Sequence, residues 1–405
     1  MHVGFVGGRA PITPERRGAI EKLVMDYAAG MSARGHEATV FTVGSDPGSV
    51  RTAEGVTLVT ITTPIERPPS HVVPAVRFGR RLTDAVRDRH RESQFDVLHA
   101  HFYPHLIGFD APEDVPTVVT EHNAHPWRRE QEFIPELDFL HGVRWELDTQ
   151  IRRLEARVAF RKARRVFSVS NAHGEWIDRT VPNVSGRRTT MYNFVQTGTY
   201  TPDATPSGSV ELPDGPVALY AGRKVPHKGL HRAVEALAEV ERPVQLAVLG
   251  PIGDGFDSAD GLPKTTSELD PYLRRVVAVA RDRGVEDRIT FIGYVPDGDL
   301  PAYYAAADVT VFPSVLESFG MIPIESMACG TPPVVHDVPP MTETVVDGET
   351  GRRVAVSSVA IARGIEDVLD GSMEQSARTH VKAEFGPDER IAAQIDAYRS
   401  VSTTE

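Results

Sequence analysis

The stretch Glu317-Ser-Phe-Gly-Met-Ile-Pro-Ile-Glu325 places two carboxylates eight positions apart. The apolar run before it, Val309-Thr-Val-Phe-Pro-Ser314, is typical of a buried strand. Residues 323–328 favour a helix, because proline is well tolerated in a first helical turn. We therefore expect Glu317 on a strand-to-helix loop and Glu325 inside the helix. A carboxylate pair around such a turn can bind a polyhydroxylated ligand at two points, and two ordinary surface glutamates would give the same spacing.

The composition of the 405-residue chain is that of a globular protein, with 40% hydrophobic and 25% charged residues. The length allows two or three domains. The net charge of −12 argues against a general attraction to nucleic acid or to an anionic membrane. The single cysteine excludes an internal disulfide framework and suits a reducing cytoplasm. The start of the chain reads as a strand and not as a leader, and no apolar run approaches the roughly 20 residues of a membrane span. We therefore expect a cytoplasmic protein.

The first half of the chain opens with a strand–loop–helix–strand unit. Residues 1–6 and 37–43 predict strands, and residues 19–34 predict the helix between them. This order is typical of a doubly wound parallel sheet. The glycines after the first strand do not form G-x-G-x-x-G, and no acidic residue ends the second strand. We therefore exclude a dinucleotide cofactor.

Histidines follow two further predicted strands of this half, at residues 95–101 and 118–123. Comparable spacings occur in metal sites, but carboxylate or thiol ligands do not stand at matching positions, so we expect no metal. The carboxyl ends of parallel strands are where the ligand crevice of an α/β domain opens. His122, at the end of the later strand, is therefore either a ligand-contacting residue or an ordinary structural histidine.

A long helix is predicted around residues 147–165. Its apolar residues would share one face; they are Leu147, Ile151, Leu154 and Val158. Seven basic residues and one glutamate lie between positions 152 and 165. A basic amphipathic helix can lie on an anionic membrane. We favour the solvated back of a domain helix instead, because the chain as a whole is acidic.

The second half of the chain begins after residues 197–216, a segment rich in Thr, Pro, Ser and Gly that we interpret as a linker between domains 1–196 and 217–386. Residues 217–222 predict a buried strand that delivers the cationic pair Arg223 and Lys224, and then Lys228, onto the loop before a helix. Arginine offers phosphate oxygens a planar fork and lysine a mobile charge. The loop therefore suits a diphosphate, and a solvated charged turn is the plain alternative.

Two motifs of the second half resemble those of one known family. Glu317-Ser-Phe-Gly, followed by Glu325 and by Met-Ala-Cys-Gly-Thr-Pro, resembles the donor-sugar signature of retaining glycosyltransferases of family 4, which have the GT-B fold. Gly222-Arg-x-x-x-x-Lys-Gly229 resembles the diphosphate clamp of the same family. The resemblance implies two Rossmann-like, doubly wound domains that face each other across a cleft. It also implies that a C-terminal helix at about 387–400 crosses back to the first domain.

The resemblance also implies roles for individual residues. Arg223 and Lys228 would neutralise the leaving nucleoside diphosphate, Glu317 would meet the hydroxyls of the transferred sugar, and His122 would lie beside the reacting sugar. Glu325 would bind the nucleotide ribose. The other donor contacts would come from Gly18, Ala19, Tyr294, Val295, Ser318, Phe319, Gly320, Met321 and Ile322. The chemistry implied needs neither a metal nor a cofactor.

Two segments depart from the family's pattern. Its glycine-rich loop, usually Gly-Gly-x-Glu, reads Gly18-Ala-Ile-Glu21 here, which changes how closely the backbone can approach a diphosphate at Ala19. Pro339-Pro340 stands where relatives often have Gly-Gly, and proline cannot donate a backbone hydrogen bond.

The expected function is retaining, metal-independent transfer of a sugar, from a UDP or GDP donor, to a small-molecule, lipid or glycan acceptor. Same-face attack assisted by the leaving phosphate is the mechanism that the resemblance implies. Loops 9–18 and 102–145 would select the acceptor. Two alternatives stay open: an epimerase or hydrolase on the same fold, with Glu121 as its candidate acid or base, and a non-catalytic protein that binds nucleotide sugars.

Overall fold

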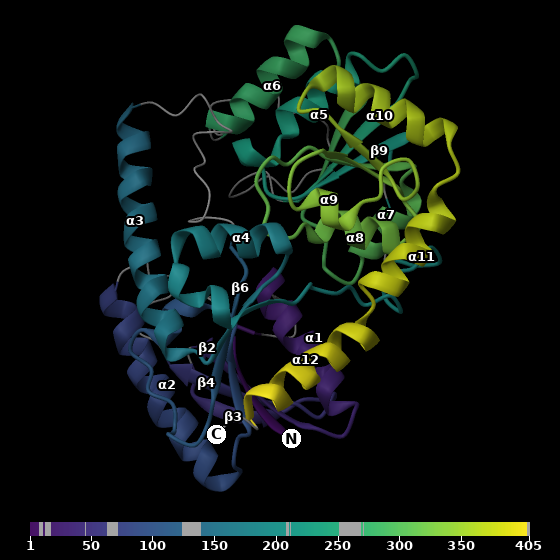
Figure 1. Ribbon diagram of the computed structural model, residues 1–405. Coiled ribbons are helices and arrows are strands. Elements are labelled where there is room, and N and C mark those ends of the chain that lie inside the picture. Colours follow the sequence, from purple (N-terminus) through teal and green to yellow (C-terminus); the bar gives the residue numbers. More distant parts are fainter. Residues whose placement is uncertain are drawn as a thin grey trace. The chain divides into compact units, whose positions relative to one another are not determined.

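The structure of the chain is a computed structural model, drawn in Figure 1. It describes residues 1–7, 11–12, 18–44, 46–62, 72–123, 139–207, 210, 212–250, 269 and 271–402. Much of the two expected acceptor loops, at 13–17 and 124–138, lies outside these residues. The described residues form two compact units. Unit 1 takes its residues from 1–129, 137–193 and 387–405, and unit 2 from 194–386.

Unit 1 is built on a sheet in which eight strands are described, in the order β3-β4-β2-β1-β5-β6-β7-β8. The strands are β1 (His2–Val6), β2 (Glu37–Gly44), β3 (Gly48–Arg51), β4 (Thr57–Thr62), β5 (Val97–Ala100), β6 (Thr117–Glu121), β7 (Arg165–Ser168) and β8 (Arg188–Thr190). Neighbouring strands are parallel except β3 and β4. Every residue of β1 is buried, as expected for a central parallel strand covered on both faces.

Helices surround this sheet. They are α1 (Ala19–Ser32), α2 (Val72–Glu92), α3 (Phe139–Lys162), α4 (Asn171–Thr180) and α12 (Pro387–Ser402), with the 3₁₀ turns η1 (Tyr103–Leu106) and η3 (Pro182–Arg187). α4 starts at Ser170, whose hydroxyl accepts a hydrogen bond from the backbone N–H of His173 at 3.0 Å and so caps the helix. α2 and α3 both pack against η1. Within the described part of the chain, each helix is too short or too polar to cross a bilayer.

Unit 2 contains a parallel sheet in which six strands are described, in the order β11-β10-β9-β12-β13-β14. The strands are β9 (Val217–Ala221), β10 (Gln245–Leu249), β11 (Ile289–Gly293), β12 (Val309–Phe312), β13 (Pro333–His336) and β14 (Arg352–Val354). The chain runs from β9 outward to β11, returns to place β12 beside β9, and continues outward to β14. In a doubly wound sheet, such a reversal is the point where the ligand crevice opens at the carboxyl ends of the strands.

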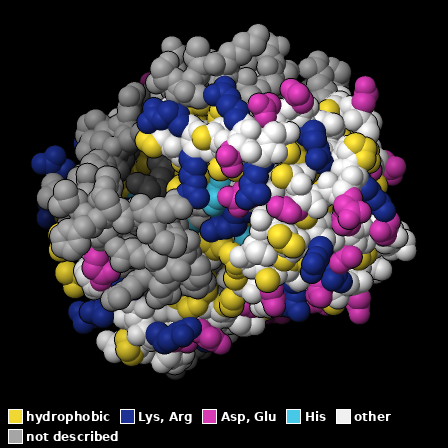
Figure 2. Space-filling view, turned by 90° about the horizontal axis from the view of Figure 1, so that it is seen from above, with side chains coloured by type: hydrophobic (Ala, Val, Ile, Leu, Met, Phe, Trp, Pro, Cys, Tyr) yellow, Lys and Arg dark blue, Asp and Glu magenta, His cyan; other side chains and the backbone are white. Residues whose placement is uncertain are grey.

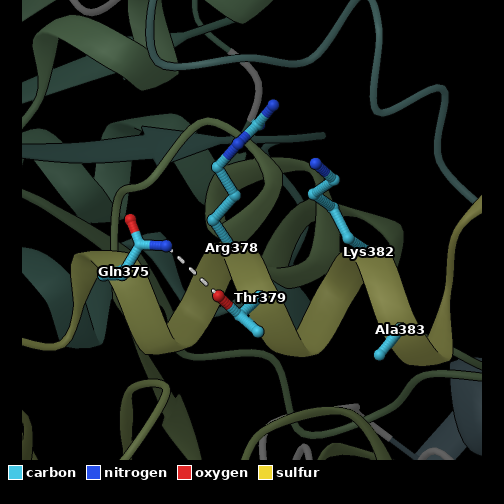
Figure 3. Close-up of a pocket in the computed structure, with 5 residues that line it drawn as sticks. All are labelled: Gln375, Arg378, Thr379, Lys382 and Ala383. Atoms are coloured by element: carbon cyan, nitrogen blue, oxygen red, sulfur yellow. Dashed lines mark hydrogen bonds between the residues drawn. The ribbon is translucent and has the colours of Figure 1, made fainter.

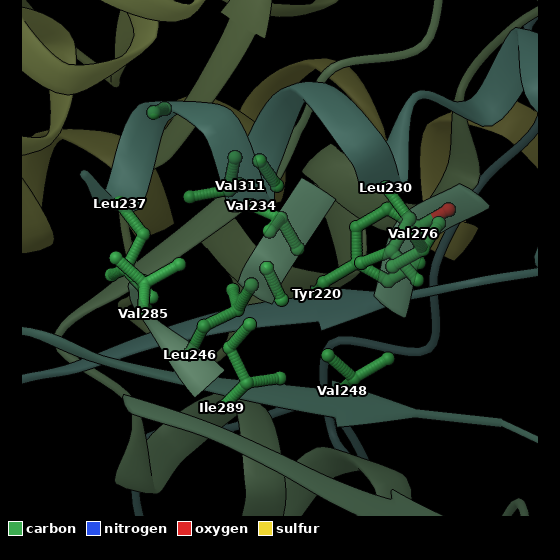
Figure 4. Packing of buried hydrophobic residues seen from close by; sticks show 14 of the residues in the cluster. Tyr220, Leu230, Val234, Leu237, Leu246, Val248, Val276, Val285, Ile289 and Val311 are labelled. Atoms are coloured by element: carbon green, nitrogen blue, oxygen red, sulfur yellow. The ribbon is translucent and has the colours of Figure 1, made fainter. Parts of the chain in front are cut away.

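The helices of unit 2 pack on this sheet through an extended apolar core. They are α5 (Leu230–Leu237), α6 (Pro271–Arg283), α7 (Leu300–Ala306), α8 (Met321–Ala328), α9 (Met341–Thr344), α10 (Ser358–Asp370) and α11 (Glu374–Glu384), with η4 (Pro226–Lys228) and η5 (Glu286–Arg288). Figure 4 shows Tyr220 of β9, Leu246 of β10, Val234 of α5 and Val276 of α6 within one cluster. Each buried side chain of this size contributes about 1.5–3 kcal/mol of transfer free energy. The core therefore fixes the carboxyl end of β9, where the candidate clamp begins.

The doubly wound fold class is confirmed in both units. The strand predicted before Glu317 is β12, and the helix predicted to contain Glu325 is α8. The edge strand β3 gave no pattern that we recognised, because all four of its residues are exposed and lack alternation.

The predicted helix is α3, and its four large apolar residues share one face, which is exposed to solvent. Leu147, Ile151 and Leu154 are 61%, 49% and 61% exposed. The face that packs on unit 1 carries Ala156 and Phe160 instead, both fully buried. The reason is tertiary: Phe160 meets Tyr103 of η1 edge to face at 5.7 Å, and the small alanines of this face let α3 lie close to the unit. Periodicity alone selects the largest apolar side chains and misses such a close-packed face.

The C-terminal helix α12 docks on the sheet of unit 1. Tyr398 is fully buried, and its hydroxyl lies 2.6 Å from Nδ1 of His99 on β5. Nε2 of His99 is 2.7 Å from the hydroxyl of Thr120 on β6. Burial lowers the pKa of His99 well below its ordinary value, so the ring is neutral and uses both nitrogens in hydrogen bonds. This hydrogen bond joins two residues, His99 and Tyr398, that are 299 positions apart in the sequence.

We expect Tyr398→Phe to lower the free energy of unfolding of unit 1 by about 1–3 kcal/mol, because it leaves a buried ring nitrogen of His99 without its partner. Chemical denaturation followed by circular dichroism measures this loss. Ala393→Ser, on the exposed side of the same helix, is the matched control and should change stability little. Equal stability of Tyr398→Phe and the native chain would show that the hydrogen bond does not hold α12 in place.

Candidate functional site

The strand reversal of unit 2 brings together two loops that are distant in sequence. β9 and β12 are parallel neighbours, with Thr310 opposite Leu219, so the loops that follow them leave from the same edge of the sheet. The first loop carries Arg223 and Lys228, and the second carries Glu317. The sequence motifs predict that both loops bind one ligand. The strand order gives the physical reason, because it places the loop after β9 beside the loop after β12.

Gly229 allows the two loops to touch. It has a φ of 75°, and a Cβ at this position would lie 2.3 Å from the carbonyl oxygen of Pro313. The backbone N–H of Val315 donates to the carbonyl of His227 at 2.9 Å, which ties the loops at a second point. Only glycine combines this positive φ with so close an approach. The glycine at the end of the Lys-Gly motif thus has a structural role.

Lys228 and Glu317 form an ion pair between Nζ and Oε1 at this junction. Their side chains are only 14% and 12% exposed. Nζ of Lys228 also lies 5.4 Å from the ring centre of Phe312, the last residue of β12. Two largely desolvated opposite charges interact more strongly than a surface pair, and each loses a partner when the other moves. The pair is therefore a polar centre that both an anion and a hydroxyl-bearing group can engage.

Arg223 and Lys224 do not act as the cationic pair that the sequence suggested. Arg223 is exposed, whereas Lys224 turns inward and donates from Nζ to the carbonyl of Leu249 at the end of β10. Burial lowers the pKa of Lys224 to about 7. A Cβ at Gly250 would lie 2.7 Å from this Nζ. Lys224 thus holds the carboxyl end of β10. Arg223 and Lys228 are the two basic side chains of the loop that a ligand can reach.

The helix α8 carries the remaining residues of the glutamate stretch. Gly320, with a φ of 94°, precedes it, and Phe319 is buried against Phe385 with ring centres 5.7 Å apart. Glu325 accepts a hydrogen bond from the hydroxyl of Tyr304 of α7 at 3.2 Å. Tyr304 was missed because no local pattern links it to Glu325. Ser318, Met321 and Ile322 are partly exposed beside Glu317.

Two of the expected donor contacts lie farther along the sheet. Tyr294 and Val295 follow β11, which is separated from β9 by β10. Tyr294 is 53% exposed. The backbone N–H of Gly250 donates to the carbonyl of Gly293 at 2.6 Å, so the turns after β10 and β11 are joined. An aromatic ring exposed at this edge is suited to contact a flat ligand group.

In unit 1, histidines gather at the carboxyl ends of β5 and β6. Nδ1 of His101 lies 3.0 Å from Nε2 of His122, and the two rings stack with centres 5.3 Å apart. Burial lowers the pKa of His122 to about 3 and that of His101 well below its ordinary value. Both imidazoles are therefore neutral near pH 7, and the ring N–H of one donates a hydrogen bond to the ring nitrogen of the other. His122 can accept or donate a hydrogen bond but does not supply a positive charge.

Glu121, the candidate acid or base of the alternative enzyme, is buried and engaged. Its Oε1 accepts hydrogen bonds from the backbone and side-chain amides of Asn123 at 2.7 and 3.1 Å. Burial raises its pKa to about 7. Nε2 of His173 lies 3.0 Å from the carbonyl of Asn123, so the carboxylate belongs to a network that shapes the turn after β6. This arrangement favours a positioning role over proton transfer to a ligand.

The start of α1 contains the two expected donor contacts of unit 1. Gly18 precedes the helix in extended conformation, and a Cβ there would lie 2.2 Å from Oε2 of Glu21. Ala19 is exposed at the first helical position. Among the residues that the structure describes, no group of three or more His, Cys, Asp and Glu side chains is arranged to hold a metal ion.

A cavity of about 410 Å³ along α11 is separate from these residues (Figure 3). It is lined by Gln375, Arg378, Thr379, Lys382 and Ala383. The Arg378 guanidinium donates to the carbonyls of Thr197, Tyr200 and Ala328. This arginine therefore connects the segment that enters unit 2 to the end of α8. We assign it a role in stability and do not assign a ligand to the cavity.

Comparison with known families gives two matches that together span most of the chain. The model described as Glycosyltransferase Family 4 matches residues 20–198, and the model described as Glycosyl transferases group 1 matches residues 206–384. The chain is 27% identical to a D-inositol 3-phosphate glycosyltransferase of Acidothermus cellulolyticus, over 94% of this chain and 85% of that protein. It is 33% identical to a GDP-mannose-dependent alpha-(1-6)-phosphatidylinositol monomannoside mannosyltransferase of Mycolicibacterium smegmatis, over 39% of this chain and 40% of that one.

Solved structures with the same fold include two well-covered examples. Sucrose-phosphate synthase from Thermosynechococcus elongatus aligns with a TM-score of 0.77 at 21% identity, covering 98% of both chains. HepE from Anabaena, solved in complex with UDP, aligns with a TM-score of 0.67 at 18% identity, covering 99% of this chain and all of that one. These likenesses and the doubly wound sheets of both units show the GT-B fold. With the two family matches, the chain belongs to the family 4 glycosyltransferases.

Proposed function

We propose that this chain transfers a sugar from a nucleotide-sugar donor to an acceptor hydroxyl with retention of the anomeric configuration. The observation that carries the proposal is the Lys228–Glu317 pair at the strand reversal of unit 2. A nucleotide sugar presents a diphosphate and a ring of hydroxyls within a few ångströms of each other. An ammonium and a carboxylate held side by side match these two groups.

Departure of the nucleoside diphosphate places negative charge on its oxygens. Lys228, with the exposed Arg223 on the same loop, would stabilise this charge in the way that a metal ion does elsewhere. The donor diphosphate would compete with Glu317 for Lys228 and release the carboxylate to accept hydrogen bonds from sugar hydroxyls. Glu325 would bind the ribose in the same manner. Arg223 and Lys228 thus support the metal-independent reaction.

Retention is supported by the surroundings of Glu317. A retaining glycosidase needs two carboxyl groups about 5–5.5 Å apart, one of which attacks the sugar. Glu317 is instead paired with Lys228, which suits recognition of hydroxyls. Same-face attack, with the leaving phosphate accepting the proton of the acceptor hydroxyl, forms the new C–O bond as the bond to the diphosphate breaks. The neutral His122 would contribute a hydrogen bond to the sugar.

The names of the relatives guide the choice of substrates to test. One relative is named as GDP-mannose-dependent, and HepE was solved with UDP, so both UDP and GDP donors are proposed. Several relatives are named D-inositol 3-phosphate glycosyltransferases, at 27% and 28% identity. An inositol phosphate is therefore the first acceptor to assay.

We expect Lys228→Ala to weaken binding of the matching nucleoside diphosphate by about 10–100-fold, the loss that a hydrogen bond to a charged group predicts. Isothermal titration calorimetry with UDP and GDP measures it. Lys382→Ala, a lysine on the exposed side of α11, is the control and should leave affinity unchanged. If the folded Lys228→Ala protein bound the nucleoside diphosphate with undiminished affinity, the proposal that this loop binds the diphosphate would be wrong.

Glu317→Gln should separate sugar recognition from diphosphate recognition. The substitution keeps the shape of the side chain, releases Lys228 from its ion pair and removes the strong acceptor of sugar hydroxyls. Binding of the nucleoside diphosphate should stay equal or tighten, while the preference for the nucleotide sugar over the nucleoside diphosphate falls about tenfold. Competition titrations give this ratio. Glu349→Gln, an exposed glutamate of unit 2, serves as the control. A loss of nucleoside diphosphate binding in Glu317→Gln would assign this residue to the nucleotide instead.

The stereochemistry and the metal requirement can be tested in one assay. With the donor that binds and D-inositol 3-phosphate or another accepted hydroxyl compound, transfer should continue at an unchanged rate in excess EDTA. Proton NMR of the product should show the donor's anomeric configuration. Inversion would contradict same-face attack, and loss of transfer in EDTA that added Mg²⁺ restores would show that Arg223 and Lys228 do not suffice.

A further inference from the structure

Helix α3 exposes an apolar stripe along one side. Val143, Leu147, Ile151, Leu154 and Val158 are between 37% and 61% exposed. Their spacings of four, four, three and four residues keep them on one helical face. At 1.5 Å per residue the stripe is about 22 Å long. A contiguous apolar surface of this kind marks an interaction site more often than ordinary solvent-facing helix does.

The same exposed side of α3 is basic toward its end. Arg157, Arg161 and Lys162 are exposed. Three nearby carboxylates are buried or paired: Glu155 is only 5% exposed, Asp148 forms an ion pair with Arg152 at 2.6 Å, and the exposed Asp110 forms one with Lys162 at 3.1 Å. Aliphatic side chains and the two arginines, Arg157 and Arg161, therefore share one surface, whereas Lys162 is neutralised by Asp110.

Positive charge is concentrated on two helices of unit 1. α2 and α3 each contain six basic and three acidic residues, which gives +6 for the two together. The whole chain carries −12, so the rest of it carries −18. On the face drawn in Figure 2, by contrast, basic and acidic side chains are intermixed among the described residues. Figure 1 shows α2 and α3 on the same side of unit 1, and both pack on η1.

The charge decides between the partners that an apolar helix face could have. In a symmetric pair of chains with parallel α3 helices, Arg157 and Arg161 of one copy would lie against those of the other, and like charges at an interface cost binding energy. An antiparallel pair avoids this repulsion, and the oligomeric state tests for it. Nucleic acid would use the arginines but not the aliphatic side chains. An anionic lipid surface uses both, because its headgroups attract the cations and its acyl boundary accepts the apolar stripe.

We propose that α3 is a membrane-docking helix, which lies flat on an anionic lipid surface with its exposed apolar stripe inserted. Arg157 and Arg161 reach the lipid phosphates through their long apolar stems while the stripe lies at the acyl boundary. The basic residues of α2 add to the attraction at longer range. The proposal rests on unit 1 alone and is independent of the sugar transfer proposed above.

Vesicle flotation of the full chain tests the proposal. We expect binding to vesicles of 70% phosphatidylcholine and 30% phosphatidylglycerol in low salt, weak binding to pure phosphatidylcholine, and release as sodium chloride rises. Leu147→Gln with Leu154→Gln, and separately Arg157→Glu with Arg161→Glu, should each weaken partitioning by about tenfold or more. All four positions are exposed, so the variants should keep their fold, which circular dichroism verifies.

Matched variants elsewhere on the surface provide the controls. Val356→Gln with Val359→Gln removes exposed apolar side chains from unit 2, and Arg281→Glu with Arg363→Glu reverses exposed charges there; both should bind vesicles like the native chain. The proposal is overturned if the native chain ignores anionic vesicles, if it binds neutral ones equally, or if the controls lose as much binding. It is also overturned if light scattering shows a dimer that Leu147→Gln with Leu154→Gln converts to a monomer without any effect on vesicles.

Discussion

The ion pair between Lys228 and Glu317 is the interaction on which the candidate site of unit 2 depends. The two residues are 89 positions apart, and only the reversal of strand order between β9 and β12 makes their loops neighbours. The apolar core behind β9 and the positive φ of Gly229 then hold the loops in contact. Because both charges are largely withdrawn from water, a ligand must offer groups that replace each of them. A diphosphate next to a polyhydroxylated ring does so, whereas a simple anion satisfies only the lysine.

The two units supply different chemistry. Unit 2 offers fixed charges, and unit 1 offers neutral imidazoles at the carboxyl ends of β5 and β6, where burial keeps His101 and His122 uncharged. A neutral imidazole can orient a hydroxyl through a hydrogen bond but does not attract an anion as a cation does. The buried Glu121 accepts two hydrogen bonds from Asn123 and so holds the turn after β6. This division fits a transfer reaction in which charge develops on one reactant only.

The sequence predicted the strand and helix around Glu317 better than it predicted the packed and exposed surfaces. Strand, loop and helix around Glu317 follow from periodicity and from proline at the helix start, and the motifs identified the partner loop. The inward turn of Lys224 has no local signal, since it depends on the carbonyl of Leu249 on another strand. The same holds for the hydroxyl of Tyr304 on Glu325. For α3 the pattern predicted the helix and its apolar face but not which face packs on the unit, since that face is formed by Ala156, Ala159 and Phe160 and the large aliphatic residues face solvent.

The most direct measurement is a crystal structure of the native chain soaked with the nucleoside diphosphate or nucleotide sugar that it binds best. The account predicts diphosphate oxygens within hydrogen-bond distance of Lys228 Nζ, with Glu317 released from the lysine and, for the nucleotide sugar, turned toward sugar hydroxyls. A nucleotide bound elsewhere, with the Lys228–Glu317 pair intact, would contradict the assignment of this pair as the donor site.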